Sequence, residues 1–155
     1  MPRLHDAVYD NKLDKVEEFV KVGDDVNEVD QDYSPLLIAS RHGHAKICEY
    51  LLLQGADVSF TRHTGTTSLI FASRFGHVNV CQILLKHGAR VNVTNNDGDT
   101  ALIFAVKNNR VDVVRLLLEN GARTDLLSGS EKLTALDYAC ERGYVDICRL
   151  LIANG

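Results

Sequence analysis

Histidine and cysteine are the residues of this 155-residue chain best suited to chemistry, because they bind metals and act as bases or nucleophiles. The sequence holds six histidines and four cysteines. His42 and His44 stand one residue apart, but no cysteine or carboxylate follows them at a recognised metal-site spacing. No serine or cysteine pairs with a histidine in a known nucleophile pattern, and no glycine-rich phosphate loop occurs. We therefore expect no metal, no cofactor and no enzymatic activity.

Three of the cysteines, Cys48, Cys81 and Cys148, occupy equivalent positions of a pattern that repeats along the chain. Another copy has Val114 at that position, so we expect these thiols to act as small buried apolar side chains. Cys140 lies at a different apolar position and is expected to be buried too. Neighbouring helices pack about 8–10 Å apart, farther than the roughly 7 Å between Cα atoms that a disulfide spans. Free buried thiols indicate a reducing compartment.

The positions that carry these side chains belong to an internal repeat. Gly43, Gly76, Asn109 and Gly143 follow one another at spacings of 33, 33 and 34 residues. The same spacings separate the glycines Gly55, Gly88, Gly121 and Gly155, the leucines Leu36, Leu69, Leu102 and Leu136, and the alanines Ala39, Ala72, Ala105 and Ala139. Gly23 precedes Gly55 by 32 residues and marks a first copy without its leading loop. Five copies therefore fill the chain.

Each copy predicts a loop followed by two short helices. Ser34, Thr67, Thr100 and Thr134 precede the first helix, and their side-chain oxygens can cap a free backbone N–H. That helix should end at the glycine or asparagine of the repeat, where a left-handed residue is favoured. The second helix carries an apolar stripe at helical spacing, as in residues 45–52. The pattern predicts an all-α solenoid.

These residues resemble the ankyrin repeat family, whose 33-residue unit opens its first helix with the motif T-P-L-H-x-A. The corresponding segments here are residues 34–39, 67–72, 100–105 and 134–139, and Gly43-His44 matches the G-H pair between the helices. The resemblance covers essentially the whole chain. It implies an ankyrin repeat solenoid of stacked helix-turn-helix units joined by β-hairpin-like loops. The single domain over residues 1–155 would consist of units at about 1–28, 29–61, 62–94, 95–128 and 129–155.

The chain departs from the family motif at the histidine, which is replaced by Leu37, Ile70, Ile103 and Asp137. We expect an apolar contact in place of any hydrogen bond that this histidine makes to neighbouring loops. Asn27 and Asn92 fall at the loop asparagine that resembles the family's target of asparaginyl hydroxylase.

The two ends of the array differ. The first copy has Asp6, Lys15 and Glu18 where later copies have apolar residues that touch the preceding copy, so it should act as an N-terminal cap. The last copy keeps apolar residues such as Ile152 and shows no full C-terminal cap. We expect the chain to be a fragment of a longer protein, and a monomer with weak end-to-end association.

Positions that vary between copies while the framework repeats are the candidates for binding. In the ankyrin architecture they lie on loop tips and first helices, which line a concave surface. Arg41, Arg74 and Lys107 share one position and should form a row of cations, and Phe75 is a large aromatic residue at a solvent-facing position. Arginine and aromatic residues dominate binding hot spots. The candidate partner-binding residues are Asp30, Tyr33, Arg41, His42, His63, Thr66, Arg74, Phe75, Asp97, Asp99, Lys107, Asn108, Glu141 and Arg142.

This surface predicts a groove that prefers an acidic or mixed-charge segment with one apolar anchor. The alternative is a solvated charged face on which Phe75 folds against a neighbour. The loop over residues 126–132 is one residue longer than its equivalents, and we interpret it as a tolerated insertion.

Charge and composition narrow the class of partner. The net charge of −4 argues against nucleic acid, because nucleic-acid binders are typically basic. No apolar stretch approaches the roughly 20 residues of a membrane span, and the N-terminus lacks the apolar stretch of a signal peptide. We expect no membrane insertion and a cytoplasmic location, with the nucleus as the alternative.

The resemblance therefore implies a protein–protein interaction module that binds another protein on its concave face. We expect the recruiting arm of a larger protein, such as a ubiquitin-ligase substrate receptor or a signalling scaffold. A stand-alone inhibitor of a signalling enzyme is one alternative, since the length resembles that of ankyrin-type inhibitors of cyclin-dependent kinases. A purely structural spacer is the other.

Overall fold

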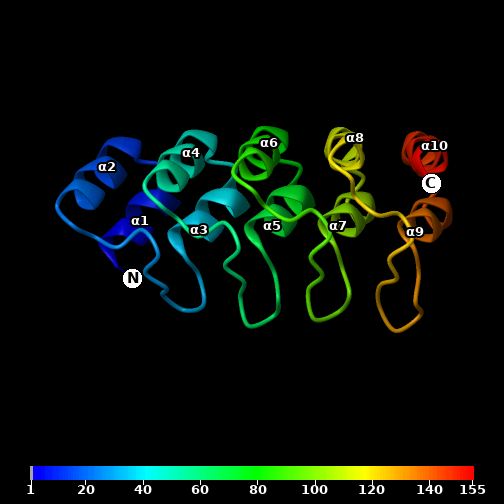
Figure 1. Cartoon of the computed structure of the whole chain (residues 1–155), viewed down its shortest axis with the longest axis horizontal. Coiled ribbons are helices and arrows are strands. Elements are labelled where there is room, and N and C mark those ends of the chain that lie inside the picture. The colour runs from blue at the N-terminus through cyan, green and yellow to red at the C-terminus, as the bar shows by residue number, and fades with distance from the viewer. Residues whose placement is uncertain (1) are drawn as a thin grey trace.

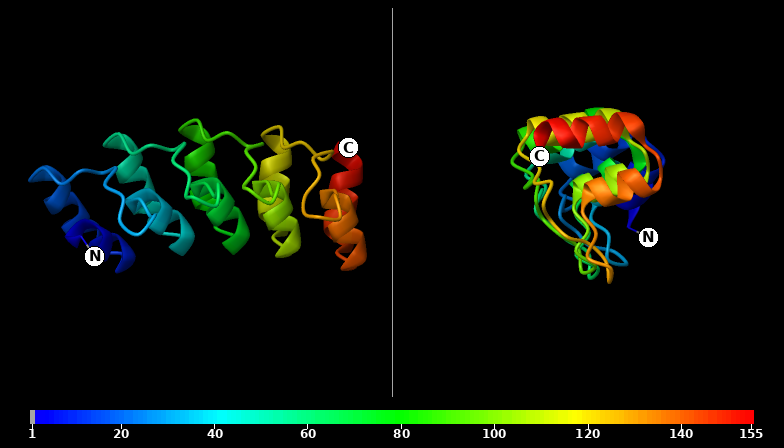
Figure 2. Two further views of the ribbon diagram at one scale, coloured as in Figure 1. Left: turned by 90° about the horizontal axis from the view of Figure 1, so that it is seen from below. Right: turned by 90° about the vertical axis from the view of Figure 1, so that its right-hand side faces the viewer.

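The structure, a computed structural model, describes residues 2–155 as a row of helix pairs. The pairs are α1 (Arg3–Tyr9) and α2 (Leu13–Lys21), α3 (Pro35–His42) and α4 (Ala45–Leu53), α5 (Ser68–Phe75) and α6 (Val78–Lys86), α7 (Ala101–Lys107) and α8 (Val111–Glu119), and α9 (Ala135–Glu141) and α10 (Val145–Asn154). The odd-numbered and even-numbered helices form two layers, and long loops project from the odd-numbered layer (Figure 1). The pairs stand side by side, with the two termini at opposite ends of the row (Figure 2). The prediction of an all-α repeat solenoid is confirmed.

No helix within residues 2–155 has the length and apolar character needed to cross a membrane.

The predicted helix caps are confirmed. The hydroxyl oxygen of Ser34 accepts a hydrogen bond from the Leu37 N–H at 3.3 Å, and Thr67, Thr100 and Thr134 cap α5, α7 and α9 in the same way. These bonds satisfy N–H groups that the first turn of a helix leaves free. Each odd-numbered helix therefore begins at a fixed residue of the repeat.

At the position of the motif histidine, the three middle copies carry the buried apolar side chains of Leu37, Ile70 and Ile103, as predicted. In the last copy Asp137 completes a capping box, because its carboxylate accepts the Thr134 N–H at 2.8 Å. Hydrogen bonds from the Thr134 N–H and hydroxyl hold the pKa of Asp137 below its ordinary value.

One histidine at this position was not anticipated from the sequence. The first copy reads Leu4-His5-Asp6-Ala7, so it retains the histidine of the family motif. The side chain of His5 is completely buried, and its Nε2 lies 3.1 Å from the carbonyl oxygen of Tyr33 in the following loop. The hydrogen bond that the other copies lack is therefore present once, at the N-terminal end of the array.

The apolar core lies between the two helix layers and continues from copy to copy. Leu36, Leu69 and Leu102 of the odd-numbered layer and Ile47 and Val80 of the even-numbered layer are almost fully buried. In the first copy Asp6, Lys15 and Glu18 are exposed. The predicted N-terminal cap is confirmed, because these polar residues face solvent where later copies face a neighbour.

A row of polar contacts also joins each copy to the one before it. Four side chains point at carbonyl oxygens in the last turn of the preceding odd-numbered helix: His44 at that of Tyr9 (3.3 Å), His77 at that of Arg41 (3.0 Å), Arg110 at that of Arg74 (3.2 Å) and Arg142 at that of Lys107 (2.7 Å). The last turn of a helix leaves its carbonyl groups without intrahelical donors. The next copy thus supplies a hydrogen-bond partner for a C-terminal carbonyl group of each odd-numbered helix except the last.

The expectation for Cys140 was wrong. Cys48 and Cys81 are buried as predicted, but Cys140 is exposed and Cys148 is half-buried. The sulfur atoms of Cys140 and Cys148 lie 3.7 Å apart, without a disulfide. Residues eight apart face each other across the helix pair of one copy, so the spacing between helices of neighbouring copies does not apply to them.

Candidate functional site

The candidate residues lie on the odd-numbered helices and on the loops that project from that layer. Nine of them are exposed: Arg41, His42, His63, Arg74, Phe75, Asp97, Asn108, Glu141 and Arg142. Asp30, Tyr33 and Lys107 are half-buried, while Thr66 and Asp99 are buried. The fold thus spreads the candidates along one side of the array.

Thr66 and Asp99 do not face solvent as the sequence suggested. The Thr66 hydroxyl lies 2.9 Å from that of Thr64 in its own loop. The Asp99 N–H donates to the Asn95 side-chain oxygen at 2.8 Å, which turns the loop back on itself. Both residues therefore shape the loops from within, because short polar side chains next to a helix start satisfy local backbone groups.

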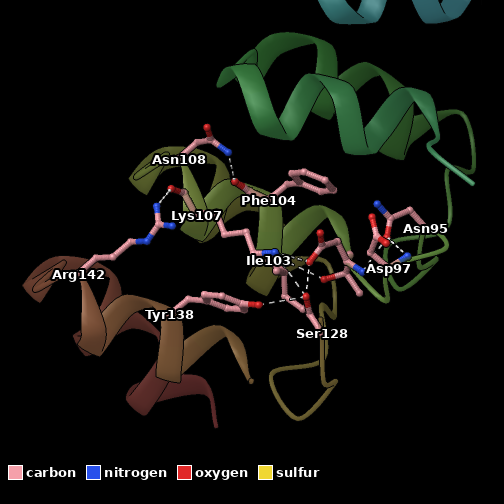
Figure 3. Close-up of polar contacts among 11 residues, drawn as sticks. Asn95, Asp97, Ile103, Phe104, Lys107, Asn108, Ser128, Tyr138 and Arg142 are labelled. Carbon is pink, nitrogen blue, oxygen red and sulfur yellow. Dashed lines mark hydrogen bonds and ion pairs between the residues drawn. The ribbon is translucent and has the colours of Figure 1, made fainter. Parts of the chain in front are cut away.

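Asp99 is also the centre of a buried polar cluster between two copies, to which Lys107, Ser128 and Tyr138 contribute (Figure 3). Its carboxylate accepts a hydrogen bond from the Lys107 ammonium at 2.7 Å and another from the Ser128 hydroxyl of the next loop. The Lys107 nitrogen also lies 4.5 Å from the ring centre of Tyr138. The longer loop therefore carries a structural contact, since Ser128 is buried within it.

This cluster corrects the predicted row of three cations. The charge of Lys107 is compensated inside the protein by Asp99, whose side chain is only 8% exposed. Arg41 and Arg74 form no ion pair with any residue of the range 2–155. Two cations of the row, rather than three, remain available to a partner.

Aromatic rings hold both arginines in place. Arg41 donates to the hydroxyl of Tyr33 at 3.1 Å, and its guanidinium carbon lies 6.0 Å from the ring centre of Phe71. Arg74 lies 5.6 Å from the ring of Phe75 and 5.7 Å from that of Phe104. A guanidinium within about 6 Å of an aromatic ring is attracted to its face.

Phe75 stays accessible although it touches its neighbours. Its side chain is 36% exposed, and its ring stacks on that of His77 with a centroid distance of 6.3 Å. Part of the ring therefore packs against the framework, while the rest faces solvent beside Arg74.

His42 adds little charge to this surface. Partial burial and the nearby charges of Arg41, His44 and His77 lower its pKa below the ordinary value, so the ring is mainly neutral at neutral pH. It packs edge-on against Tyr9, with ring centroids 4.9 Å apart.

The loop tips are linked to one another rather than free. Asp32 accepts hydrogen bonds from His63 and from the Arg62 guanidinium at 3.1 Å. Desolvation raises the pKa of Asp32, but the hydrogen bonds from His63 and the charge of Arg62 outweigh it and hold the pKa below its ordinary value. Asp32 and Arg62 carry this contact although sequence reasoning singled out neither of them.

Towards the C-terminal end, the side chains of two candidate residues form hydrogen bonds with backbone carbonyl groups. The Asn108 amide donates to the Phe104 carbonyl at 2.8 Å, and Arg142 donates to the Lys107 carbonyl (Figure 3). Glu141 makes no ion pair with any described residue. This end of the surface therefore presents a free carboxylate.

A small pocket lies between the first two copies, beside Arg41. Its volume is about 120 Å³, and it is lined by His5, Tyr9, Asp30, Gln31, Tyr33, Ile38, Arg41 and His42. Sequence reasoning identified Asp30, Tyr33, Arg41 and His42 but missed the contribution of the first copy. Tyr9 is exposed at the end of α1. The 32-residue offset of the first copy places Tyr9 at the repeat position of Arg41, which is the signal that could have identified it.

Within residues 2–155, no group of three or more His, Cys, Asp and Glu side chains is arranged to hold a metal ion. The surface of the odd-numbered helices combines two exposed arginines, a partly exposed aromatic ring and a small pocket.

A comparison with known protein families covers residues 4–155 of the chain. A family model described as ankyrin repeats (3 copies) matches residues 4–95 and 88–155. No curated protein matches the chain.

Proposed function

The chain belongs to the ankyrin repeat family, and we propose that it binds a partner protein on its concave face, as the recruiting arm of a larger protein. Ankyrin repeats are in general protein–protein interaction modules, and the family is typically non-enzymatic. The proposed domain is the single array of five units over residues 1–155.

The observation that carries the proposal is the exposure of Phe75 next to Arg74 on a rigid helix. The preceding residues of α5, from Ser68 to Ser73, are all buried, so this helix cannot move independently of the array. An exposed aromatic ring beside an arginine is the composition typical of a binding hot spot. The proposed contact residues are Tyr33, Arg41, His42, His63, Arg74, Phe75, Asp97, Asn108 and Glu141.

The test is affinity capture from cell lysate with a variant of the concave face. The variant combines Arg41→Ala, Arg74→Ala and Phe75→Ala and leaves Lys107 unchanged, because Lys107 pairs with Asp99 inside the protein. The matched control combines Arg115→Ala, Arg149→Ala and Leu53→Ala. It removes two exposed arginines and one exposed apolar residue from the even-numbered layer. Circular dichroism checks that both variants fold.

A partner that is captured by the wild type and the control, but lost by the face variant, supports the proposal. Equal loss in both variants, or capture by all three proteins, contradicts it. A captured enzyme whose activity the chain blocks would favour the stand-alone inhibitor. No captured partner would favour the structural spacer.

We further propose a reducing compartment such as the cytoplasm, which agrees with the free buried thiols of Cys48 and Cys81. We expect a monomer with weak end-to-end association, which light scattering over a concentration series measures.

A further inference from the structure

On the surface of the odd-numbered helices, which is the proposed concave face, the charge changes sign along the row of equivalent positions 41, 74, 107 and 141. Arg41 and Arg74 have no carboxylate partner within residues 2–155, Lys107 is neutralised by Asp99, and Glu141 is a free carboxylate. The net positive charge of the row is therefore confined to its N-terminal half. A ligand that matches this half carries negative charge, and one that extended over the whole row would meet Glu141.

Both arginines are already positioned for such a ligand. Arg41 donates to the Tyr33 hydroxyl and lies near the ring of Phe71, and the Arg74 guanidinium lies 5.6 Å from the ring centre of Phe75 and 5.7 Å from that of Phe104. Side chains that are ordered before binding lose less conformational entropy when a partner arrives.

The pocket next to Arg41 is lined by two residues that each hold a buried polar atom without a hydrogen-bond donor. Two buried side-chain atoms of the described chain have no hydrogen-bond partner, His5 Nδ1 and Asp30 Oδ2, and both residues line this pocket. His5 Nε2 faces the Tyr33 carbonyl and so carries the ring proton, which leaves Nδ1 as an acceptor in the neutral ring. Buried polar atoms normally have partners. The pocket therefore suits an apolar side chain that brings an N–H or O–H group.

We infer that the N-terminal half of the concave face binds an extended acidic segment of a partner protein, with two carboxylates on Arg41 and Arg74 and a tryptophan or tyrosine in the pocket. This inference rests on the proposed function and specifies the chemistry of its partner. Neighbouring helices stand about 8–10 Å apart, and an extended peptide in the polyproline II conformation advances about 3.1 Å per residue and returns to the same face every third residue. The two carboxylates are therefore three residues apart, and the aromatic residue lies on the side of the carboxylate that contacts Arg41.

The experiment is a selection of peptides from a random displayed library against the wild-type chain. Enriched peptides are then measured by fluorescence anisotropy against three variants: Arg41→Glu/Arg74→Glu, the matched control Arg115→Glu/Arg149→Glu, and Tyr9→Ala. Arg115 and Arg149 are exposed on α8 and α10, so the control changes the net charge equally without touching the concave face. Circular dichroism confirms folding of each variant.

The expected peptides carry acidic residues three apart with a tryptophan or tyrosine to one side. The face variant and Tyr9→Ala should each bind them at least about fivefold more weakly, as for hot-spot residues, while the control binds within about twofold of the wild type. Affinity should fall as salt is added, because exposed charges are screened beyond about 10 Å at 0.1 M salt.

Peptides without an acidic excess that are still lost in the face variant would overturn this inference and leave the proposed function standing. Peptides that bind all variants equally would contradict both. Failure to enrich any peptide above the background of an empty support also counts against the inference.

Discussion

At the scale of single residues, the charge that a partner meets depends on which side chains are already paired inside the protein. Arg41, Arg74 and Lys107 occupy equivalent positions, but only Lys107 has a carboxylate at the start of its own helix, where the other copies have Tyr33 and Thr66. Asp99 therefore removes one cation from the surface. In exchange, it ties the loops of two neighbouring copies together through Ser128.

The Asp99 cluster should contribute strongly to stability. We expect Asp99→Ala to lower the free energy of unfolding by about 3 kcal/mol, because it leaves the half-buried Lys107 ammonium without its partner. Urea unfolding followed by circular dichroism measures the change. Asp97→Ala is the control in the same loop, and its exposed side chain should change stability by less than about 0.5 kcal/mol. Equal effects of the two substitutions would show that the ion pair is not important for stability.

At the scale of helices, each odd-numbered element depends on its successor for its C-terminal end. The ring of His77 occupies the space above Gly43 and reaches the Arg41 carbonyl. Gly43 has φ of 76°, the left-handed conformation that ends α3. The same glycine thus serves both the end of its own helix and the contact with the next copy.

Substitution of Gly43 by alanine should therefore lower the free energy of unfolding more than substitution of Gly55 by alanine. Both glycines have positive φ, 76° and 91°, so each substitution carries a strain of about 1–2 kcal/mol. A Cβ at Gly43 would lie 2.6 Å from His77 Nδ1, whereas one at Gly55 has no neighbour within 4 Å. We expect Gly43→Ala to lose about 1 kcal/mol more in chemical unfolding, since the His77 hydrogen bond is displaced. In a His77→Ala background this extra loss should disappear, and its persistence would contradict the explanation.

At the scale of the whole molecule, the place of a residue in the array decides its environment. Cys48 and Cys81 lie in copies packed on both sides, and burial raises the pKa of Cys48 to about 12 and that of Cys81 to about 11. Cys140 lies in the last copy of the chain and is exposed. The hydrogen bond with Cys148 raises the pKa of Cys140 above its ordinary value, which favours the thiol form.

The two cysteines of the last copy should therefore react with a thiol reagent, whereas the buried cysteines of the inner copies should not. In the native chain at a pH of about 8, we expect a chromogenic disulfide reagent to react with Cys140 and then Cys148, while Cys48 and Cys81 stay protonated and unreactive. Peptide mass mapping assigns the labels, and denaturation should expose all four thiols. A Ser73→Cys variant is the matched control, because it places a second thiol beside Cys81 inside the array. Rapid labelling of that pair in the folded variant would refute the role of burial.

The architecture of this protein could be predicted from its repeat pattern alone. The spacings of 33 and 34 residues and the caps at Ser34, Thr67, Thr100 and Thr134 predicted the helix pairs that the structure contains. These signals are local: a cap, a left-handed glycine and an apolar stripe each act within one helix, so they can be read from neighbouring residues. The position of the candidate surface was implied by the resemblance to ankyrin repeats, applied to the positions that vary between copies.

Only the tertiary structure decided which residues of that surface are available. The pairing of Lys107 with Asp99 and the pocket formed by Tyr9 with Arg41 join side chains from different loops, helices and copies. Repeat spacing gives each residue its place in the array, but not the direction of a long flexible side chain. That direction depends on which hydrogen-bond partner, ring or neighbouring copy lies within reach, which is a property of the packed array as a whole.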